Sequence, residues 1–205
     1  MPKFPHPPPP DELRRLPAEL RTARAGTLVV RIYPRGGPHP TTWRQFRFDG
    51  PLPSARFDHH VAAERRGVLY ATRDLVTCVA EVFQGSRLVD RVTADRFLAG
   101  FRLARSVRLL DLTGDWPTRA GASQALASGP RPRAQAWART IYEAYPKVEG
   151  ISYPSSMHGG NPALVLFERA ETALPTTPDL DVPLSHPGLL PDLVRAAGSL
   201  GYLIR

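Results

Sequence analysis

The chain has 205 residues, of which 42% are hydrophobic and 22% are charged, a composition typical of a globular protein with one sizeable core rather than of a disordered chain. Its single cysteine, Cys78, excludes an intramolecular disulfide and a cysteine zinc site. The formal net charge of +8 is carried mostly by arginine and favours an anionic partner such as nucleic acid, a nucleotide or an acidic protein, although a merely basic, solvated surface explains it equally well.

Residues 1–26 are predicted to form a proline-rich N-terminal arm. The stretch "PHPPPP" favours extended polyproline II and cannot be a helix. The stretch "DELRRLPAELRTAR" is consistent with one short helix that breaks near Pro17. We expect weak order in this arm. The chain has no apolar run long enough for a membrane span, and its N-terminus lacks the apolar core of a signal peptide, so we expect a cytoplasmic protein.

The next elements are two strands and a helix. Residues 26–34 and 67–72 are β-rich and are bounded by glycine, proline or charge. Between them, residues 35–53 are predicted to be a loop with aromatic anchors at Trp43, Phe46 and Phe48. Residues 73–83, "RDLVTCVAEVF", have apolar positions at helical spacing and predict a helix.

The second half of the chain continues the mixture of strands and helices. Strands are predicted at 106–114, 150–156 and 162–169, an amphipathic helix at 133–145, and a helix with a last short strand at the end of the chain. The strands do not alternate strictly with helices, so a compact α+β domain is favoured over a doubly wound parallel sheet. No G-x-G-x-x-G motif and no Walker A loop occurs, so a nucleotide site must be of another kind.

Glu81 is one of the few acids inside an apolar-flanked element. A helical wheel places its side chain opposite the stripe centred on Leu75, Val79 and Phe83. Periodicity alone therefore predicts a solvated carboxylate and does not reveal whether that face borders a cleft.

Two further features admit both a functional and an ordinary structural interpretation. Arg31 interrupts an apolar strand, so it either meets a partner in a polar cleft or lies on the wet face of a half-buried sheet. The loop "SYPSSMHGGNP" (152–162) offers hydroxyls and backbone N–H groups that can bind an anion, or is simply a polar loop. The spacing of His59, His60 and His158 does not support a metal site.

Six stretches occur in the order seen in the RES-domain family, which the chain resembles over about residues 27–170. These stretches are "VVRIYP", "ARFD", "GVLYAT", "VAEVF", "GISYPSS" and "NPALVLF". The most specific element is a strand ending in Tyr-Ala followed by a helix carrying Ala-Glu, with eleven positions from Tyr70 to Glu81.

The resemblance implies a compact domain over residues 27–205 with the fold of ADP-ribosyltransferases, built on a central mixed or antiparallel sheet with flanking helices. It also implies a toxin of a bacterial toxin–antitoxin pair whose antitoxin carries an Xre-type helix-turn-helix. Members of the family consume NAD by hydrolysis or phosphorolysis, and some ADP-ribosylate a protein. NAD would then be a substrate rather than a cofactor.

Carried over by motif, the resemblance implies the following site residues. Catalytic roles fall on Glu81, Arg31 and Tyr70, and NAD contacts on Arg31, Arg56, Tyr70, Ser155 and Asn161. Ser155 and Ser156 are adjacent, so either is a candidate for the family's serine. Many members have Arg-Trp-Asn where this chain has Arg56-Phe57-Asp58, and the anion at Asp58 is expected to weaken dinucleotide binding nearby.

The chemistry implied is cleavage of the bond between nicotinamide and ribose. A carboxylate stabilises the oxocarbenium-like centre, arginines bind the pyrophosphate and a tyrosine ring stacks on nicotinamide. No metal is expected, because nicotinamide leaves as a neutral group. Expected partners are a phosphate or protein acceptor and the antitoxin, in a hetero-oligomer that meets nucleic acid only through the antitoxin. The alternatives are a protein ADP-ribosyltransferase on the same fold and a basic, non-enzymatic nucleic-acid-binding module.

Overall fold

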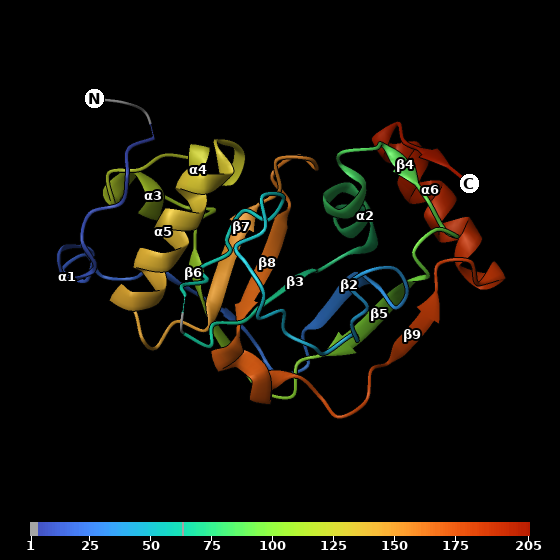
Figure 1. The fold of residues 1–205 in the computed structure, drawn as a ribbon, viewed down its shortest axis with the longest axis horizontal. Helices are drawn as coiled ribbons and strands as arrows, with labels where there is room; N and C mark the ends of the chain where they lie inside the picture. The colour runs from blue at the N-terminus through green and yellow to red at the C-terminus, as the bar shows by residue number, and fades with distance from the viewer. Residues whose placement is uncertain (1–3, 63) are drawn as a thin grey trace.

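An eight-stranded mixed sheet forms the centre of the protein in a computed structural model that describes residues 4–62 and 64–205 (Figure 1). The strand order is β1-β6-β7-β8-β3-β2-β5-β9, and β6 and β7 form its parallel pair. The strands are β1 (Leu20–Ala23), β2 (Leu28–Pro34), β3 (Val68–Thr72), β5 (Arg96–Arg102), β6 (Val107–Asp111), β7 (Gly150–Pro154), β8 (Pro162–Phe167) and β9 (Leu180–Pro183). A separate parallel pair joins β4 (Leu88–Val89) to β10 (Leu203–Ile204).

Helices cover one face of the sheet in two groups (Figure 1). The first group lies over β6, β7 and β8 and contains α1 (Pro10–Leu13), α3 (Trp116–Arg119), α4 (Ala125–Ser128) and α5 (Arg131–Ala144). The second lies over β2 and β5 and contains α2 (Leu75–Phe83) and α6 (Leu190–Leu200). Two 3₁₀ turns, Glu168–Ala173 and Pro187–Leu189, complete the elements.

Side-chain alternation along the central strands separates three hydrophobic clusters. On β3, Val68 and Tyr70 face the α5 group, whereas Leu69 and Ala71 face the opposite side of the sheet. On β2, Ile32 packs under α2 and α6. The two helical groups therefore rest on the same face of the sheet with separate cores, and the strip of sheet between them carries the floor of a cavity.

The fold class and the main elements are those that the sequence predicts. The expected strands at 26–34, 67–72, 106–114, 150–156 and 162–169 correspond to β2, β3, β6, β7 and β8. The helix expected at 73–83 is α2, and Asp74 caps it by accepting a hydrogen bond from the Thr77 N–H at 2.8 Å. The expected loop at 35–53 is anchored by buried Trp43 and Phe46, whereas Phe48 is 37% exposed.

The N-terminal residues differ from the expectation of a weakly ordered arm. Residues 20–23 form strand β1, which pairs antiparallel with β6, where a broken helix was expected. Phe4 and Leu13 are buried in the α5 cluster, and the Trp137 indole donates a hydrogen bond to the Pro5 carbonyl at 3.0 Å. The prolines prevent a long helix, but they do not prevent an extended chain from packing along α5 and entering the sheet.

Besides β1, the strands β4, β5 and β9 were not predicted from the sequence. Strand β5, "RFLAGFR", pairs with β2 along seven positions, and β9 adds a further edge strand. Pro183, which has no backbone N–H, lies at the end of β9. An edge strand tolerates a proline there because not every residue of an edge strand has to donate to the ladder. In the described part of the chain, no helix has the length and apolar character required to cross a membrane.

The packing of the N-terminal segment predicts a measurable loss of stability. Leu13→Ala empties a site that is 2% exposed and should lower the free energy of unfolding by about 2–5 kcal/mol, measured by denaturant titration. Leu20→Ala, at a side chain that is 50% exposed, is the matched control and should cost about 0.5 kcal/mol or less. Equal small losses for both variants would show that the segment does not pack as described.

Candidate active site

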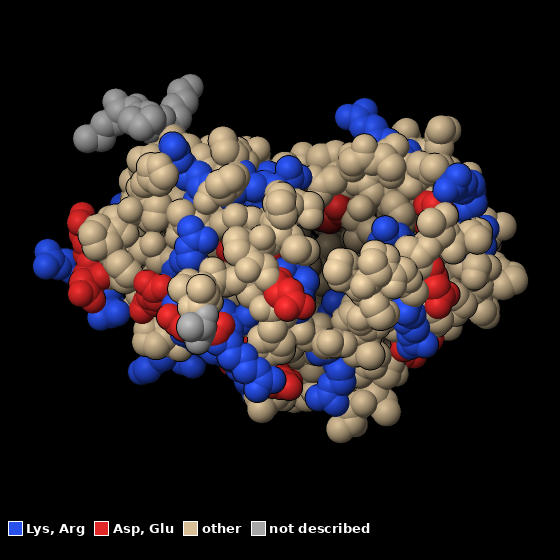
Figure 2. Space-filling view, viewed as in Figure 1, with Lys and Arg blue, Asp and Glu red and all other residues tan. Residues whose placement is uncertain are grey.

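A cavity of about 190 Å³ lies between α2 and the α4–α5 corner, above β3 and β7. The molecular surface is visibly hollowed on this face, with acidic atoms inside the hollow and basic side chains around it (Figure 2). The lining combines acidic, basic, aromatic and hydroxyl groups in one small volume, as catalytic pockets do. Its principal polar side chains are Ser54, Arg56, Tyr70, Thr72, Glu81, Gln84, Arg131, Tyr153 and Ser156.

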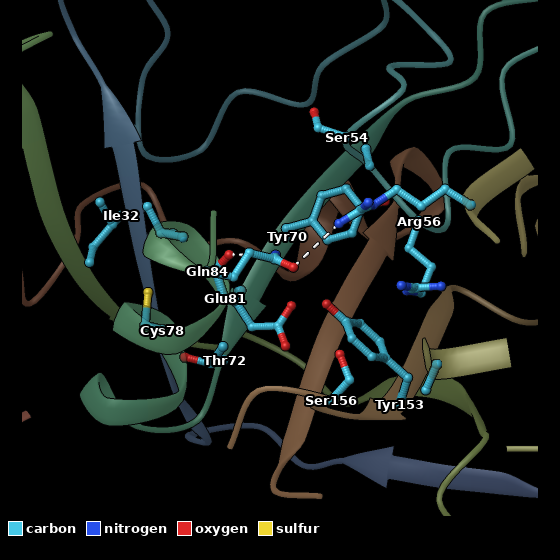
Figure 3. Close-up of a pocket in the computed structure, with 15 residues that line it drawn as sticks. Ile32, Ser54, Arg56, Tyr70, Thr72, Cys78, Glu81, Gln84, Tyr153 and Ser156 are labelled. Carbon is cyan, nitrogen blue, oxygen red and sulfur yellow. Dashed lines mark hydrogen bonds between the residues drawn. The ribbon is translucent and has the colours of Figure 1, made fainter. Parts of the chain in front are cut away.

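Glu81 lies on the α2 wall and its carboxylate points into the cavity (Figure 3). The Ser155 hydroxyl donates a hydrogen bond to Glu81 Oε1 at 2.6 Å. Ser155 Oγ in turn accepts hydrogen bonds from the N–H groups of Met157 and His158, at 3.2 and 3.1 Å. The carboxylate is thus fixed by a hydroxyl that the following turn holds in place.

Helical periodicity alone misplaces Glu81 because α2 is covered on two sides. Its apolar stripe packs on β2 and α6, as expected. The face that includes Thr77 is also buried, because the turn after β7 lies against it. There the His158 Nδ1 and Thr77 Oγ1 atoms lie 2.8 Å apart in a hydrogen bond.

The two serines have different positions. Ser155 is buried and bonds Glu81, whereas Ser156 is exposed and lines the cavity beside Tyr153 (Figure 3). Ser155 therefore orients the Glu81 carboxylate, whereas Ser156 presents its hydroxyl to the cavity. The sequence alone could not distinguish these two roles.

Two guanidinium groups, Arg56 and Arg131, enter the cavity from the side opposite Glu81. Their hydrogen-bond partners are neutral: Arg56 donates to the Gly129 carbonyl, and Arg131 donates to Gln84 Oε1 at 3.3 Å. Burial, and next the positive charge of Arg131, lowers the pKa of Arg56. A bound anion would relieve both effects.

Two tyrosines form the floor. Burial raises the pKa of Tyr70 well above its usual value, and the nearby Asp58 carboxylate adds to the effect. Burial likewise raises the pKa of Tyr153, with the Glu81 charge as the next cause. Both phenols are therefore neutral near pH 7 and act as aromatic surfaces or hydrogen-bond donors.

Asp58 does not line the cavity. Its side chain is completely buried, and Arg47 Nη2 donates to both of its oxygens, at 2.6 and 2.7 Å. The expected harm to dinucleotide binding assumed an unpaired anion near the ligand, and the structure shows a carboxylate already paired with a cation.

Three residues that the family resemblance implies as NAD contacts lie outside the cavity lining: Ser155, which bonds Glu81, together with Arg31 and Asn161. Arg31 sits on the opposite face of β2, where its guanidinium donates to the Trp43 and Gln45 carbonyls and where burial lowers its pKa to about 10. Asn161 donates to the His158 carbonyl at 3.0 Å and stabilises the turn after β7. Their roles in contacting NAD stay predictions.

The sequence analysis missed Arg131, Gln84 and Tyr153 as candidate site residues. Arg131 had only one available signal, an arginine in the first turn of a helix, where a cation opposes the helix dipole. Tyr153 stands within the quoted "GISYPSS", and strand alternation from Ile151 places it on the same face of β7. Gln84 follows Glu81 by one helical turn and donates to its carbonyl at 2.8 Å.

Among the described residues, no three His, Cys, Asp or Glu side chains are grouped so as to hold a metal ion. His59 is instead a core residue, stacked between Tyr142 and Phe167 at ring distances of 4.4 and 4.3 Å. Burial lowers its pKa, although Glu168, whose Oε2 lies 3.6 Å from His59 Nε2, opposes that effect.

The architecture is that of a RES domain. The family model described as "RES domain" matches residues 5–185, so the chain belongs to the RES-domain family, and the match extends beyond the 27–170 recognised from motifs. Among solved structures, the fold is similar to a chain of the Mycobacterium tuberculosis MbcT–MbcA toxin–antitoxin complex. That likeness has a TM-score of 0.53 at 16% identity and covers 84% of this chain and 91% of the other. A search of curated proteins returned no match.

The His59 environment predicts an acid-sensitive stability. Because the folded state lowers the pKa of His59, the unfolded state binds the proton more readily, and stability is lost as the pH falls through the ordinary value of 6.5. His59→Phe should flatten this dependence between pH 7.5 and 5.5, measured as the free energy of unfolding at each pH. His39→Phe, at an exposed histidine outside the core, is the control and should leave the dependence unchanged.

Proposed function

We propose that the protein is a toxin that consumes NAD by cleaving the bond between nicotinamide and ribose. One observation carries the proposal: a carboxylate, Glu81, is held by Ser155 in a cavity that also contains two guanidinium groups without carboxylate partners among the described residues. Such a cavity matches a substrate that carries both a developing cation and a dianion, as NAD does.

Glu81 supplies the negative charge that the reaction requires. As the glycosidic bond breaks, its electron pair leaves with nicotinamide, which becomes neutral, and positive charge develops on the ribose. A preoriented carboxylate stabilises that charge and accepts the proton of the attacking hydroxyl. The hydrogen bond from Ser155 fixes one oxygen, so the other is free to face the ribose.

Arg56 and Arg131 supply the positive charge. The pyrophosphate of NAD carries two negative charges, and guanidinium groups bind such oxygens in a bidentate manner. The cavity of about 190 Å³ is smaller than the 300–1,000 Å³ or so of most ligand pockets, so we expect the nicotinamide riboside half to enter while the adenosine lies outside. Tyr70 or Tyr153 then offers a ring face to the nicotinamide.

The toxin role and the antitoxin partner rest on the family and on the fold. The similar solved chain is described as part of a toxin–antitoxin complex. We infer that this chain likewise has a cognate antitoxin, of the Xre type that the family resemblance implies, and that it acts as a hetero-oligomer. The proposed acceptor is water or phosphate, and a protein acceptor is the alternative that the first experiment below distinguishes.

Glu81→Gln should lower the rate of nicotinamide release from NAD by about 10²-fold or more, because it removes the charge that stabilises the ribosyl cation. Purified protein is incubated with NAD, with and without phosphate, and free nicotinamide is followed by chromatography. Retention of radiolabelled ADP-ribose on protein in a lysate would identify a protein acceptor instead.

The exposed Glu171 provides the matched control, and Glu171→Gln should retain wild-type activity. The wild-type chain should also arrest growth when expressed without an antitoxin, whereas Glu81→Gln should not. A fully active Glu81→Gln variant would contradict the catalytic assignment, and a wild-type protein that releases no nicotinamide would contradict the proposed function.

Arg131→Gln should raise the KM for NAD about tenfold while changing kcat little, because it removes a charge-assisted contact to the pyrophosphate. Initial rates over a range of NAD concentrations measure both constants. Arg24→Gln, at an exposed arginine far from the cavity lining, should leave both unchanged. An unaltered KM in Arg131→Gln would remove Arg131 from the binding site.

A further inference from the structure

The Asp58 carboxylate accepts four hydrogen bonds although it is completely buried. Two come from Arg47, at 2.6 and 2.7 Å, one comes from the Leu52 N–H at 2.8 Å and one from the Tyr70 hydroxyl at 3.0 Å. A buried charge with this many donors is well compensated. Removing any one donor would leave part of the carboxylate's charge without a hydrogen-bond partner.

These contacts connect the cavity floor to the segment that forms its rim. Arg47 also pairs through its backbone with Val68 of β3, with N–O distances of 2.9 and 3.0 Å. The Phe57 N–H donates to the Tyr70 hydroxyl at 2.9 Å. The rim segment, residues 52–57, is therefore attached to β3 directly through Phe57 and indirectly, through Asp58, at Leu52. It carries Ser54 and Arg56 to the cavity.

A second attachment comes from α5. Gln135 is buried, and its Nε2 donates to the Leu52 carbonyl at 2.8 Å and to the Ala55 carbonyl at 2.7 Å. The rim segment is thus held between the sheet and the helix whose first turn carries Arg131. The relative position of Arg56 and Arg131 depends on this attachment.

We propose that Asp58, paired with Arg47, is a positioning residue that holds Tyr70 and the rim segment so that Arg56 and Arg131 converge on the anionic part of the substrate. This inference rests on the proposed function. It assigns to Asp58 a role through other residues, because its oxygens contact Arg47, Leu52 and Tyr70 rather than the cavity.

The same geometry determines what Tyr70 can do. Its hydroxyl donates to Asp58 and accepts from Phe57, so both of its principal hydrogen-bonding directions are used inside the protein. The ring rather than the hydroxyl therefore acts on the substrate. Loss of the hydroxyl should then weaken substrate binding instead of slowing the chemical step.

The test compares Asp58→Asn, Arg47→Gln, the double variant and Tyr70→Phe. Asp58→Asn replaces one acceptor oxygen with an NH₂ donor, which then faces groups that are themselves donors. This variant should raise the KM for NAD about tenfold, with kcat within about threefold of wild type. Tyr70→Phe should give the same pattern. The double variant pairs two neutral amides and should recover most of the lost affinity, and it also serves if either single variant fails to fold.

Asp179→Asn is the matched control, because Asp179 forms an exposed ion pair with Arg102. It should retain wild-type kinetics. Amide hydrogen exchange at residues 52 and 57 gives a readout that needs no substrate: both amides should exchange faster in Asp58→Asn than in the wild type, and be unchanged in Asp179→Asn.

The outcomes separate this inference from the proposed function. A KM in Asp58→Asn equal to that of Asp179→Asn overturns the positioning role, and so does a loss of kcat at unchanged KM in Tyr70→Phe. If the wild type releases no nicotinamide, the proposed function fails, and unchanged exchange at residues 52 and 57 in Asp58→Asn would then reject the attachment as well.

Discussion

The hydrogen bond from Ser155 to Glu81 joins the two halves of the molecule at the wall of the cavity. Glu81 belongs to α2, which packs on β2 and α6, whereas Ser155 follows β7, which packs under α5. Each half has its own hydrophobic core, and the cavity lies between the two. The cavity exists because polar contacts, rather than a continuous apolar layer, bridge this interval. A charged group can be held there without the cost of full burial.

The arginine content has a largely architectural explanation. Arg169 donates to three carbonyls near the end of α5, those of Tyr142, Tyr145 and Val148, where a cation also complements the helix dipole. Arg14 donates to the Ala144 carbonyl in the same region. On the face shown in Figure 2, basic and acidic side chains alternate without one continuous basic patch. These arginines hold segments together through several hydrogen bonds each. The net charge is therefore a weaker argument for nucleic-acid binding.

The elements that were predicted from sequence share a physical signal, and those that were missed lack it. Strands β2, β3 and β8 are rich in β-branched or large aliphatic residues, and α2 has a clear apolar stripe. Strand β5, by contrast, contains Gly100 and two arginines, and β1 is four residues long and follows a proline-rich stretch. Their pairing energies come from neighbouring strands, which no local pattern contains.

Local sequence patterns were an even weaker guide to the candidate site. The periodicity of α2 correctly located its apolar stripe but could not tell that a distant turn covers the opposite side, so only the family motif pointed to Glu81. The motif also identified Tyr70, Arg56 and the serine pair, which the structure brings to one cavity or its wall. Arg131 and Gln135 belong to a helix some fifty residues away from Glu81, and their approach to the site depends on tertiary packing alone.

The packing of α6 on α2 has a consequence for the order in which the protein matures during synthesis. Val79 and Phe83, on the buried side of the helix that presents Glu81, share a cluster with Leu193, Ala196 and Ala197 of α6. The ribosome makes α2 more than a hundred residues before it makes α6, which packs against it. Domains acquire stable packing only when their partner segments have emerged. The helix therefore lacks one of its two packing partners through most of synthesis, and the wall of the cavity is completed only after residues 190–200 have left the exit tunnel.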